Sequence, residues 1–336
     1  MPNSNGLVRI LSIDGGGIRG ILPGQVLIKL EELTGRAIYE LFDLIAGTST
    51  GGILTCVLLA PADPADPAAG AKYTAQQAAD LYLDRGDAIF EPSLARKMIS
   101  LGGVADEKLD AEKLEEVLKD YLDDLWLRDL LKPCLITAYD IRSRQPHFFN
   151  PYRAQNASHD FLLRDVARAT SAAPTYFETV RIKSRSNVLY PLIDGGVFAN
   201  NPAMCAYVEA RSMNFDGGVE NPTARDMVML SIGTGSKKKA YSYSDAKDWG
   251  LAGWVRPLVD ILMSGNSDTV HHQLNQIYDA IELKPHYLRI DPDLGDASTE
   301  MDDATSDNLI ALKEAGIACS EANANDLSEL AALLTT

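Results

Sequence analysis

The stretch Leu-Phe-Asp-Leu-Ile-Ala-Gly-Thr-Ser-Thr-Gly-Gly, residues 41–52, joins an apolar run to a second apolar segment at residues 53–59. The first run, up to Ala46, has the composition of a buried strand, and residues 53–59 favour a helix. Between them, Gly47-Thr-Ser-Thr-Gly51 fits the pattern G-x-S-x-G, in which a strained strand-to-helix turn exposes a serine above a sheet. We therefore predict a nucleophilic Ser49 close to the positive end of a helix dipole.

The same order of elements occurs just before this stretch. Leu7 to Ile13 predicts a strand, Gly15 to Gly17 a turn, and Leu22 to Leu33 a helix that Gly35 closes. Strand, glycine turn and helix, repeated twice, is the βαβ pattern of a parallel sheet covered by helices, so we expect an α/β fold. Further strands are expected at Cys134–Tyr139, Val188–Ile193, Met227–Ile232 and Tyr287–Ile290.

The remaining segments predict helices joined by loops. Thr74-Ala-Gln-Gln77 fits a capping box that opens a helix to about Asp87. Other helices are expected at Ala111–Asp120, at Phe161–Thr170, twice within residues 250–280 and from about Ser306. No repeat or linker divides the chain, so we expect one domain over residues 1–336, with a motif-bearing core at about 7–235 and a helical C-terminal part at about 250–336. Residues 61–109 are a candidate lid.

The charge balance excludes some partners. The chain has 47 acidic and 31 basic residues, a formal charge of −16, which argues against nucleic acid and against adsorption to anionic membranes. A lipid substrate would therefore dock through apolar contacts or reach the site dispersed. Lys237-Lys-Lys239 fits a phosphate headgroup or, more simply, a solvated loop. Trp249 to Met263 fits an acyl pocket, an interface or a plain buried helix.

Cysteine usage and hydropathy bear on the cellular setting. The four cysteines, at 56, 134, 205 and 319, form no C-x-x-C pair, so we expect neither a disulfide framework nor a metal site. No apolar run approaches the ~18–20 residues that span a bilayer, and no basic leader occupies residues 1–6. We therefore expect a cytoplasmic protein with no transmembrane segment. We predict no particular oligomeric state.

The glycine cluster after the first strand permits two interpretations. Asp14-Gly-Gly-Gly-Ile-Arg-Gly20 exposes successive backbone N–H groups that can surround the oxyanion of an acyl-transfer intermediate. The same letters also fit G-x-G-x-x-G, the dinucleotide-binding fingerprint, and Glu40 and Asp43 lie near the spacing expected for a ribose contact. That alternative explains neither Ser49 nor the later Asp-Gly-Gly at 194–196.

A serine nucleophile needs a base. Asp194 follows the apolar run Tyr-Pro-Leu-Ile, which would deliver it to the edge of the sheet where ligand sites of α/β folds gather, and Gly195 and Gly196 leave space beside it. A histidine is the more usual base, and the pair His271-His272 would complete the chain order Ser, Asp, His. Both a Ser–Asp dyad and a triad therefore remain open on these residues.

Taken together, the segments 14–20, 47–51 and 194–196, in this order, resemble the patatin-like phospholipases, which include plant patatins and bacterial relatives. Ala169-Thr-Ser-Ala-Ala-Pro174 and Gly233-Thr-Gly235 are also similar to segments of that family. The resemblance implies a three-layer α/β/α sandwich with a mainly parallel central sheet. It also implies cleavage of lipid acyl esters without calcium or an organic cofactor.

The resemblance further implies a role for each matching residue. Ser49 would be the nucleophile and Asp194 its base, in a dyad. Gly15, Gly16 and Gly17 would form the oxyanion hole, with Arg19 supporting their loop. The expected partner is a lipid or acyl-ester substrate, dispersed or at a membrane surface. Patatin-like domains also occur as nucleotide-activated effectors and storage proteins, and these remain alternative functions.

Overall fold

The computed structural model describes residues 6–90, 109–215, 219–235 and 241–335. Within these ranges eight strands form the central sheet. Five lie side by side and run parallel, in the order β10 (Tyr287–Ile290), β9 (Met227–Ile232), β1 (Val8–Ile13), β2 (Leu44–Thr48) and β3 (Cys134–Asp140). The others are antiparallel to their neighbours: β6 (Leu189–Asp194) and β4 (Gln145–Phe149) pair with β3, and β5 (Val180–Lys183) with β6. The sheet is therefore mixed but mainly parallel.

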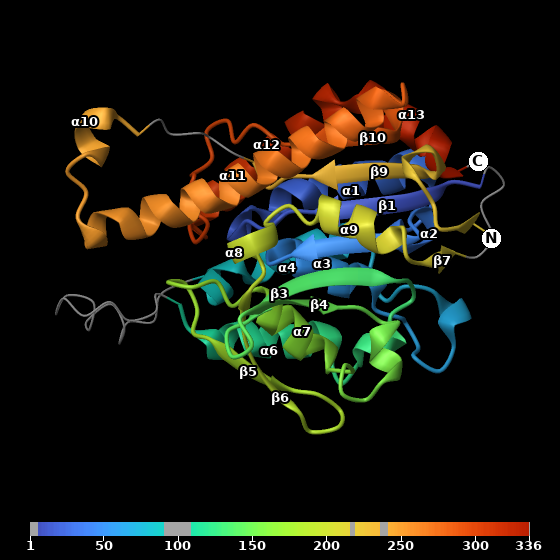
Figure 1. Ribbon diagram of the computed structural model, residues 1–336, viewed down its shortest axis with the longest axis horizontal. Coiled ribbons are helices and arrows are strands. Elements are labelled where there is room, and N and C mark those ends of the chain that lie inside the picture. Colours follow the sequence, from blue (N-terminus) through green and yellow to red (C-terminus); the bar gives the residue numbers. More distant parts are fainter. Residues whose placement is uncertain (1–5, 91–108, 216–218, 236–240, 336) are drawn as a thin grey trace.

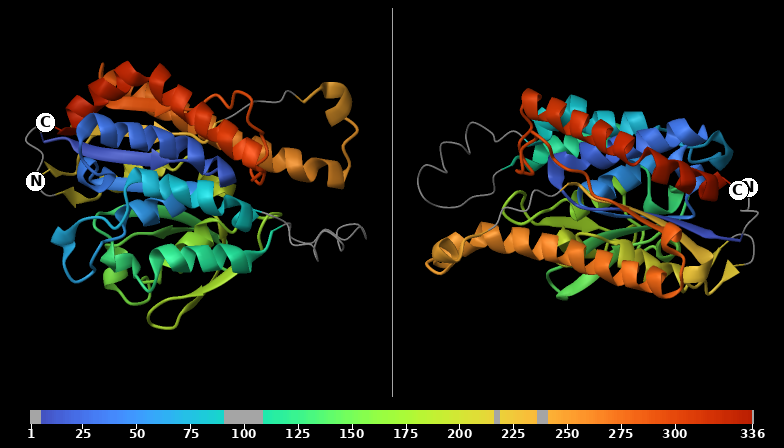
Figure 2. Two further views of the ribbon diagram at one scale, coloured as in Figure 1. Left: turned by 180° about the vertical axis from the view of Figure 1, so that it is seen from behind. Right: turned by 90° about the horizontal axis from the view of Figure 1, so that it is seen from above.

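Helices cover both faces of the sheet (Figures 1 and 2). One face carries α1 (Ile21–Thr34), α3 (Thr50–Leu59), α4 (Ala75–Phe90), α6 (Ala111–Leu122), α7 (Leu163–Thr170), α12 (Ser306–Ala322) and α13 (Ala324–Thr335). The other carries α8 (Gly196–Ala199), α9 (Ala203–Ala210) and α11 (Leu251–Ala280). Two short helices, α2 (Ile38–Leu41) and α10 (Tyr243–Ala246), and the hairpin β7 (Asn214–Phe215) with β8 (Val219–Glu220) complete the described elements. This confirms the expected three-layer α/β/α sandwich.

Side-chain alternation along β1 explains the two layers. Leu11 and Ile13 pack into the larger apolar cluster, which includes α1 and α3. Val8 and Ile10 point the other way, into the smaller cluster with α9 and α11. Both sets are fully buried, so the strand is apolar throughout, as parallel strands covered on both faces are.

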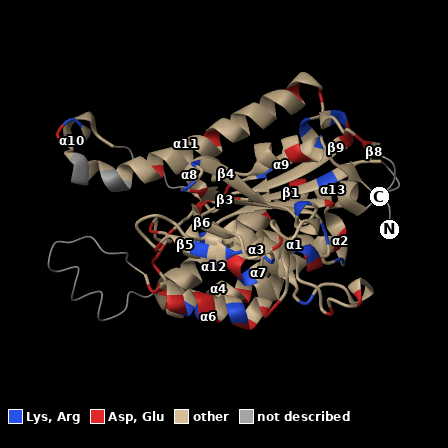
Figure 3. Cartoon of the chain, turned by 60° about the horizontal axis from the view of Figure 1, so that its bottom comes forward, with Lys and Arg blue, Asp and Glu red and all other residues tan. Residues whose placement is uncertain are grey.

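Most charged residues belong to the helices and loops around the sheet (Figure 3), although a few, such as Asp14 and Arg168, are buried. Acidic and basic residues occupy the outer surfaces of the helices, α6 among them, while the strands at the centre carry few charges. Within the described ranges, no helix combines the length and apolar character needed to cross a bilayer.

Several element boundaries differ from the sequence-based expectation. Residues 41–43 do not extend β2, because residues 38–41 form the short helix α2 and Asp43 is bound by Arg9, through its backbone N–H and its guanidinium. The capping box at Thr74 and Gln77 is confirmed, with reciprocal hydrogen bonds of 3.0 and 3.3 Å. The strands β4 and β5, which are short and contain no long apolar run, were not expected at all.

The C-terminal part departs furthest from expectation. One continuous helix, α11, replaces the two helices expected within residues 250–280. Pro257 lies inside it without ending it, because a proline removes a single N–H donor while later turns of the helix pack on α8 and β10. The strand expected at Tyr287–Ile290 is confirmed as β10, an edge strand of the sheet within this otherwise helical part.

The candidate lid at 61–109 includes a firmly packed helix. α4 packs on α1 and α6 and continues to Phe90, three residues beyond its expected end at Asp87. Residues 91–108 of this candidate lid lie outside the described residues, as do the lysines at 237–239.

The strand order determines where the candidate site forms. β1, β2, β9 and β10 are parallel, so their carboxyl ends share one edge of the sheet. β6 runs the opposite way, yet its last residue, Asp194, pairs with Ala138 directly after the Thr137–Thr48 pair. Asp194 therefore ends beside the carboxyl end of β2, where Ser49 begins the turn to α3.

Candidate functional site

Ser49 occupies a strained turn between β2 and α3. Its φ of 56° and ψ of −121° lie in a region that non-glycine residues rarely adopt. The chain has no room for side chains around it: a Cβ at Gly47 would overlap the Gly51 carbonyl, and one at Gly51 would overlap the Ile13 carbonyl. The small residues of G-x-S-x-G are thus required by close backbone packing, as the sequence predicted.

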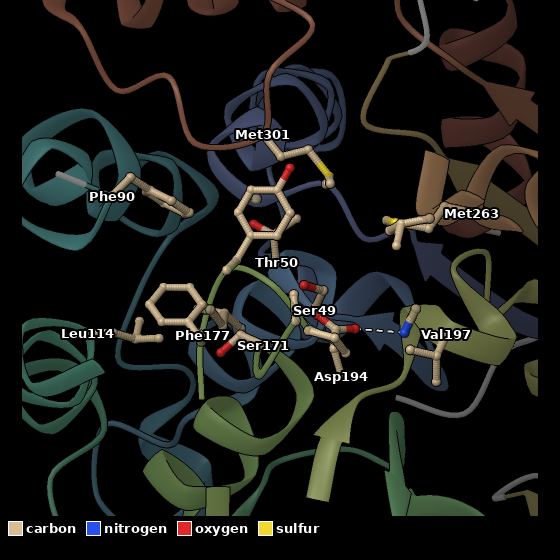
Figure 4. A pocket seen from close by; sticks show the side chains of 18 of the residues that line it. Ser49, Thr50, Phe90, Leu114, Ser171, Phe177, Asp194, Val197, Met263 and Met301 are labelled. Carbon is tan, nitrogen blue, oxygen red and sulfur yellow. Dashed lines mark hydrogen bonds between the residues drawn. The ribbon is translucent and has the colours of Figure 1, made fainter. Parts of the chain in front are cut away.

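Asp194 lies next to Ser49 (Figure 4). Its side chain is buried, which raises the pKa of the carboxyl to about 7, although hydrogen bonds with the Ser49 side chain and the Gly196 N–H lower it. The Gly196 N–H lies 2.7 Å from the carboxylate oxygen Oδ1. A carboxyl that titrates near neutral pH, in contact with a serine hydroxyl, is suited to accept the hydroxyl proton.

The segment 169–174 positions Ser49 and Asp194 through their backbone N–H groups. The Ser49 backbone N–H donates to the Thr170 hydroxyl at 2.9 Å, and the Asp194 N–H donates to the Ala172 carbonyl at 3.0 Å. These roles of Thr170 and Ala172 were not predicted individually, although the segment had been singled out for its similarity to the family.

The histidines lie elsewhere. His271 Nδ1 is 3.2 Å from the Tyr287 hydroxyl, its ring packs against that of Tyr287, and His272 is exposed. None of the five histidines, all of which the structure describes, lines the cavity that contains Ser49. The arrangement therefore favours the Ser–Asp pair over a histidine triad.

The glycine loop after β1 crosses beside Ser49, but its three N–H groups are not equivalent. The Gly15 N–H donates to the Asn200 carbonyl at 3.1 Å, so it is not available to an oxyanion. Gly16 and Gly17 line the cavity with Ser49, and within the described ranges no protein acceptor takes their N–H groups. The expectation of three donors is thus reduced to two, Gly16 and Gly17.

The loop is held from two sides. The Thr234 hydroxyl donates to the Gly15 carbonyl at 2.7 Å, and a Cβ at Gly16 would overlap the Thr234 side chain. Arg19 donates to the Gly235 carbonyl at 3.1 Å and approaches the Gly16 carbonyl at 3.4 Å. Arg19 thus ties the glycine loop to the loop after β9.

A buried ion pair lies beneath the loop and was missed by the sequence reasoning. Arg289 of β10 binds both carboxylate oxygens of Asp14, at 2.9 and 2.7 Å, and the Ser231 hydroxyl at 2.8 Å. Burial raises the pKa of Asp14 to about 6, although the Arg289 charge lowers it. The only signal in the sequence was a single arginine within the apolar strand Tyr-Leu-Arg-Ile.

An apolar cavity extends from the Ser49 hydroxyl and the glycine loop (Figure 4). Phe90, Leu114 and Phe177 lie on one side of Ser49, and Val197 and Met263 on the other. The apolar lining comprises Ile53, Ile89, Phe90, Leu114, Ala173, Pro174, Phe177, Val197, Val259, Leu262, Met263 and Met301. Polar groups are thus gathered at one point of an otherwise apolar space, as suits a substrate with one ester and a long apolar chain.

Comparison with known proteins gives the same answer as the motifs. Residues 11–207 match the family model described as patatin-like phospholipase. The chain belongs to the patatin-like phospholipase family. It is 35% identical to patatin-like protein 2 of Arabidopsis thaliana, over 94% of this chain and 83% of that protein. It is 34% identical to patatin-like protein 1 of rice, Oryza sativa subsp. indica, over 91% and 79%.

A crystal structure of VipD from Legionella pneumophila is a distant structural likeness of this patatin-like chain. Its sequence is 11% identical, with a TM-score of 0.41 over 95% of this chain and 67% of that one. The family supports lipid acyl hydrolase activity and a lipid substrate in general terms.

The two acidic residues of the dinucleotide-binding alternative, Asp43 and Glu40, have structural partners in this patatin-like chain. Asp43 is held by the Arg9 guanidinium at 2.7 Å, and Glu40 accepts the Ala37 N–H at 3.0 Å to cap α2. Neither carboxylate is therefore free to bind a ribose beside Gly15–Gly20.

Within the ranges that the structure describes, no group of three or more His, Cys, Asp or Glu side chains is arranged to hold a metal ion.

Proposed function

We propose that this protein hydrolyses fatty-acyl esters of lipids through a Ser49–Asp194 dyad and an acyl-enzyme. One observation carries the proposal: a buried carboxyl, with a pKa raised to about 7, lies beside the serine of a strained elbow, at the polar point of an apolar cavity. Membership of the patatin-like phospholipase family supports the same class of reaction.

In the first half-reaction, Asp194 accepts the hydroxyl proton while Ser49 Oγ attacks the ester carbonyl carbon. The carbonyl π electrons move onto the oxygen, where the Gly16 and Gly17 N–H groups donate to the resulting oxyanion. When the carbonyl re-forms, the bond to the alcohol breaks, and the leaving oxygen takes the proton from Asp194. In the second half-reaction a water molecule repeats the attack, Asp194 takes its proton, and the proton returns to Ser49 as the fatty acid leaves.

The roles of the other residues follow from their contacts. Arg19 is a positioning residue, since it bonds loop carbonyls and not the cavity. Thr170 positions the nucleophile through the Ser49 backbone N–H. We assign the apolar lining to the acyl chain, whose length and headgroup the proposal does not specify.

We also propose a reducing, cytoplasmic setting. All four cysteines are free thiols, and Cys56 and Cys134 are both fully buried in the core. Burial raises the pKa of each of these two thiols, so they are inert at neutral pH. Fractionation of the native host followed by immunodetection tests this setting, and recovery outside the cytoplasm would contradict it.

The dyad is tested with p-nitrophenyl acyl esters in the presence of a chelator. Ser49→Ala should lower kcat/KM on the order of 10⁴-fold or more because no nucleophile remains. Asp194→Asn should lower it on the order of 10³-fold because the amide accepts no proton. Circular dichroism confirms that each variant folds.

The control is the double variant His271→Gln/His272→Gln, which should keep the wild-type rate. If it is as inactive as Ser49→Ala while folded, the enzyme uses a histidine base and the dyad is wrong. Mass spectrometry after a quench should also find the acyl group on Ser49, and its absence during steady turnover would contradict the acyl-enzyme.

A further inference from the structure

The helix α11 has two unlike halves. Its C-terminal half buries Val270, Leu274 and Tyr278 against the sheet, at the spacing of one helix face. Its N-terminal half projects beyond the sheet, on the side of the molecule away from the chain termini (Figure 1). Four large side chains there, which we call the outer apolar face, are between 41% and 53% exposed: Trp254, Leu258, Ile261 and Leu262. They follow at intervals of four, three and one residues, so they share one side of the helix.

The outer apolar face is continuous with the cavity of Ser49. Val259, Leu262 and Met263, from the same turns of α11, line that cavity. Leu262 does both, since it lines the cavity and is 53% exposed. An acyl chain can therefore pass from this face to Ser49 along apolar side chains. A helix that served only to close the core would need a narrower apolar stripe than this.

Aromatic side chains gather at the tip of the same region. The rings of Tyr241, Trp249 and Trp254 meet edge to face, with centroid separations of 5.1 and 5.0 Å. Tyr243 in the neighbouring α10 is 84% exposed. Tryptophan and tyrosine are enriched at the boundary between lipid and water, because each has an apolar ring and a polar handle.

We propose that the outer apolar face docks on the surface of a zwitterionic lipid bilayer and passes a lipid from it to Ser49. The proposal rests on the proposed lipid hydrolase function. The formal charge of −16 opposes an anionic surface, so docking must use apolar contact.

A second copy of the chain fits this face less well. The four exposed side chains are far fewer than the roughly 20–30 residues that each partner of a stable protein complex commonly contributes. A bilayer sets no such threshold, because each inserted side chain contributes separately. The face also borders the cavity of Ser49. The chain belongs to the patatin-like phospholipase family, whose substrates are lipids.

The test compares two double variants that remove matched exposed aliphatic side chains. Leu258→Ser/Ile261→Ser alters the outer apolar face without touching the cavity lining. Ile310→Ser/Ile317→Ser removes two exposed isoleucines, 57% and 39% exposed, from one side of α12. Each protein is co-sedimented with phosphatidylcholine vesicles, and its rate is measured on those vesicles and on a soluble short-chain p-nitrophenyl ester.

We expect the α11 variant to bind vesicles at least tenfold more weakly and to hydrolyse vesicle lipid correspondingly slowly, with its rate on the soluble ester unchanged. The α12 variant should match wild type in all three measurements, and adding anionic lipid should not strengthen wild-type binding. Vesicle binding that is unaffected in the α11 variant, or equally weak in both variants, overturns the proposal.

Two further outcomes are distinct. If light scattering shows that wild type is a dimer and only the α11 variant is monomeric, with equal vesicle binding, the face is a self-association surface and the docking proposal fails. If wild type hydrolyses neither substrate, the proposed function fails, while sedimentation still decides whether the face docks on lipid.

Discussion

The glycine loop and the apolar wall border the same cavity but are built in opposite ways. The loop at residues 14–19 is fixed by hydrogen bonds with Thr234 after β9, with Arg289 of β10 and with the turn after α8. The wall is made of aliphatic and aromatic side chains from five helices, from the segment 173–177 and from Met301. Rigid donors suit an oxyanion whose position cannot vary, whereas apolar packing tolerates substrates of different shape. Changes to the loop should therefore affect the rate of the chemical step, and changes to the wall the choice of substrate.

The largest effect is expected at Gly16. Gly16→Ala places a Cβ inside the Thr234 side chain and displaces the N–H groups beside Ser49, so kcat should fall on the order of 100-fold or more. The matched control is Gly265→Ala on α11, where a Cβ meets nothing within 4 Å. Steady-state kinetics on a soluble ester decide the matter. Full activity in a folded Gly16→Ala protein would show that the loop does not hold the oxyanion.

The next effect tests whether the buried ion pair fixes the loop. Arg289→Met leaves Asp14 buried without its partner, so kcat should fall roughly 10- to 100-fold with little change in KM, and Arg289→Lys should restore part of it. Arg9→Met is the control, because it breaks a similar Arg–Asp pair, with Asp43, at the opposite end of β1. It should lower the melting temperature without changing kcat. Equal losses of kcat in Arg289→Met and Arg9→Met would show that Arg289 stabilises the fold in general and does not position the glycine loop.

The pH dependence of kcat/KM gives a smaller effect, which tests the chemical step at Ser49. Asp194 must be ionised to accept the Ser49 proton, and burial raises its pKa to about 7. The value of kcat/KM should therefore rise about tenfold per pH unit below about 7 and level off above it. Initial rates between pH 5 and pH 9 on a neutral ester show this directly. A rate that stays level down to pH 5, as an ordinary carboxyl pKa of about 4 would give, would contradict the assigned base.

The smallest effect on the chemical step should come from the apolar wall. Leu114→Ala enlarges the cavity beside Phe177, so preference should move toward longer or bulkier acyl chains while kcat on a short ester changes less than about threefold. Leu118→Ala, one turn along α6 and also buried but outside the cavity, is the control. Both changes should destabilise the fold by about 2–4 kcal/mol. The same chain-length profile in both variants would show that Leu114 does not meet the acyl chain.

The comparison also explains which parts of the site were predictable. Ser49 and the glycines around it could be found in the sequence because a strained turn and close backbone contacts restrict the residue types locally. The Gly15 N–H could not be assigned correctly, because its acceptor, the Asn200 carbonyl, is 185 residues away. Arg289 was missed for the same reason, since its partner Asp14 lies 275 residues earlier.

The sequence by itself determined the alternation of strands and helices, the elbow at Ser49, the glycine loop and the family. These depend on periodicity and on backbone conformations that few residue types can adopt. Only the tertiary structure decided that the antiparallel β6 brings Asp194 to Ser49, that two loop amides face the cavity, and that one helix, α11, borders both cavity and solvent. These depend on contacts between distant segments, which local pattern does not contain because packing of the whole chain selects them.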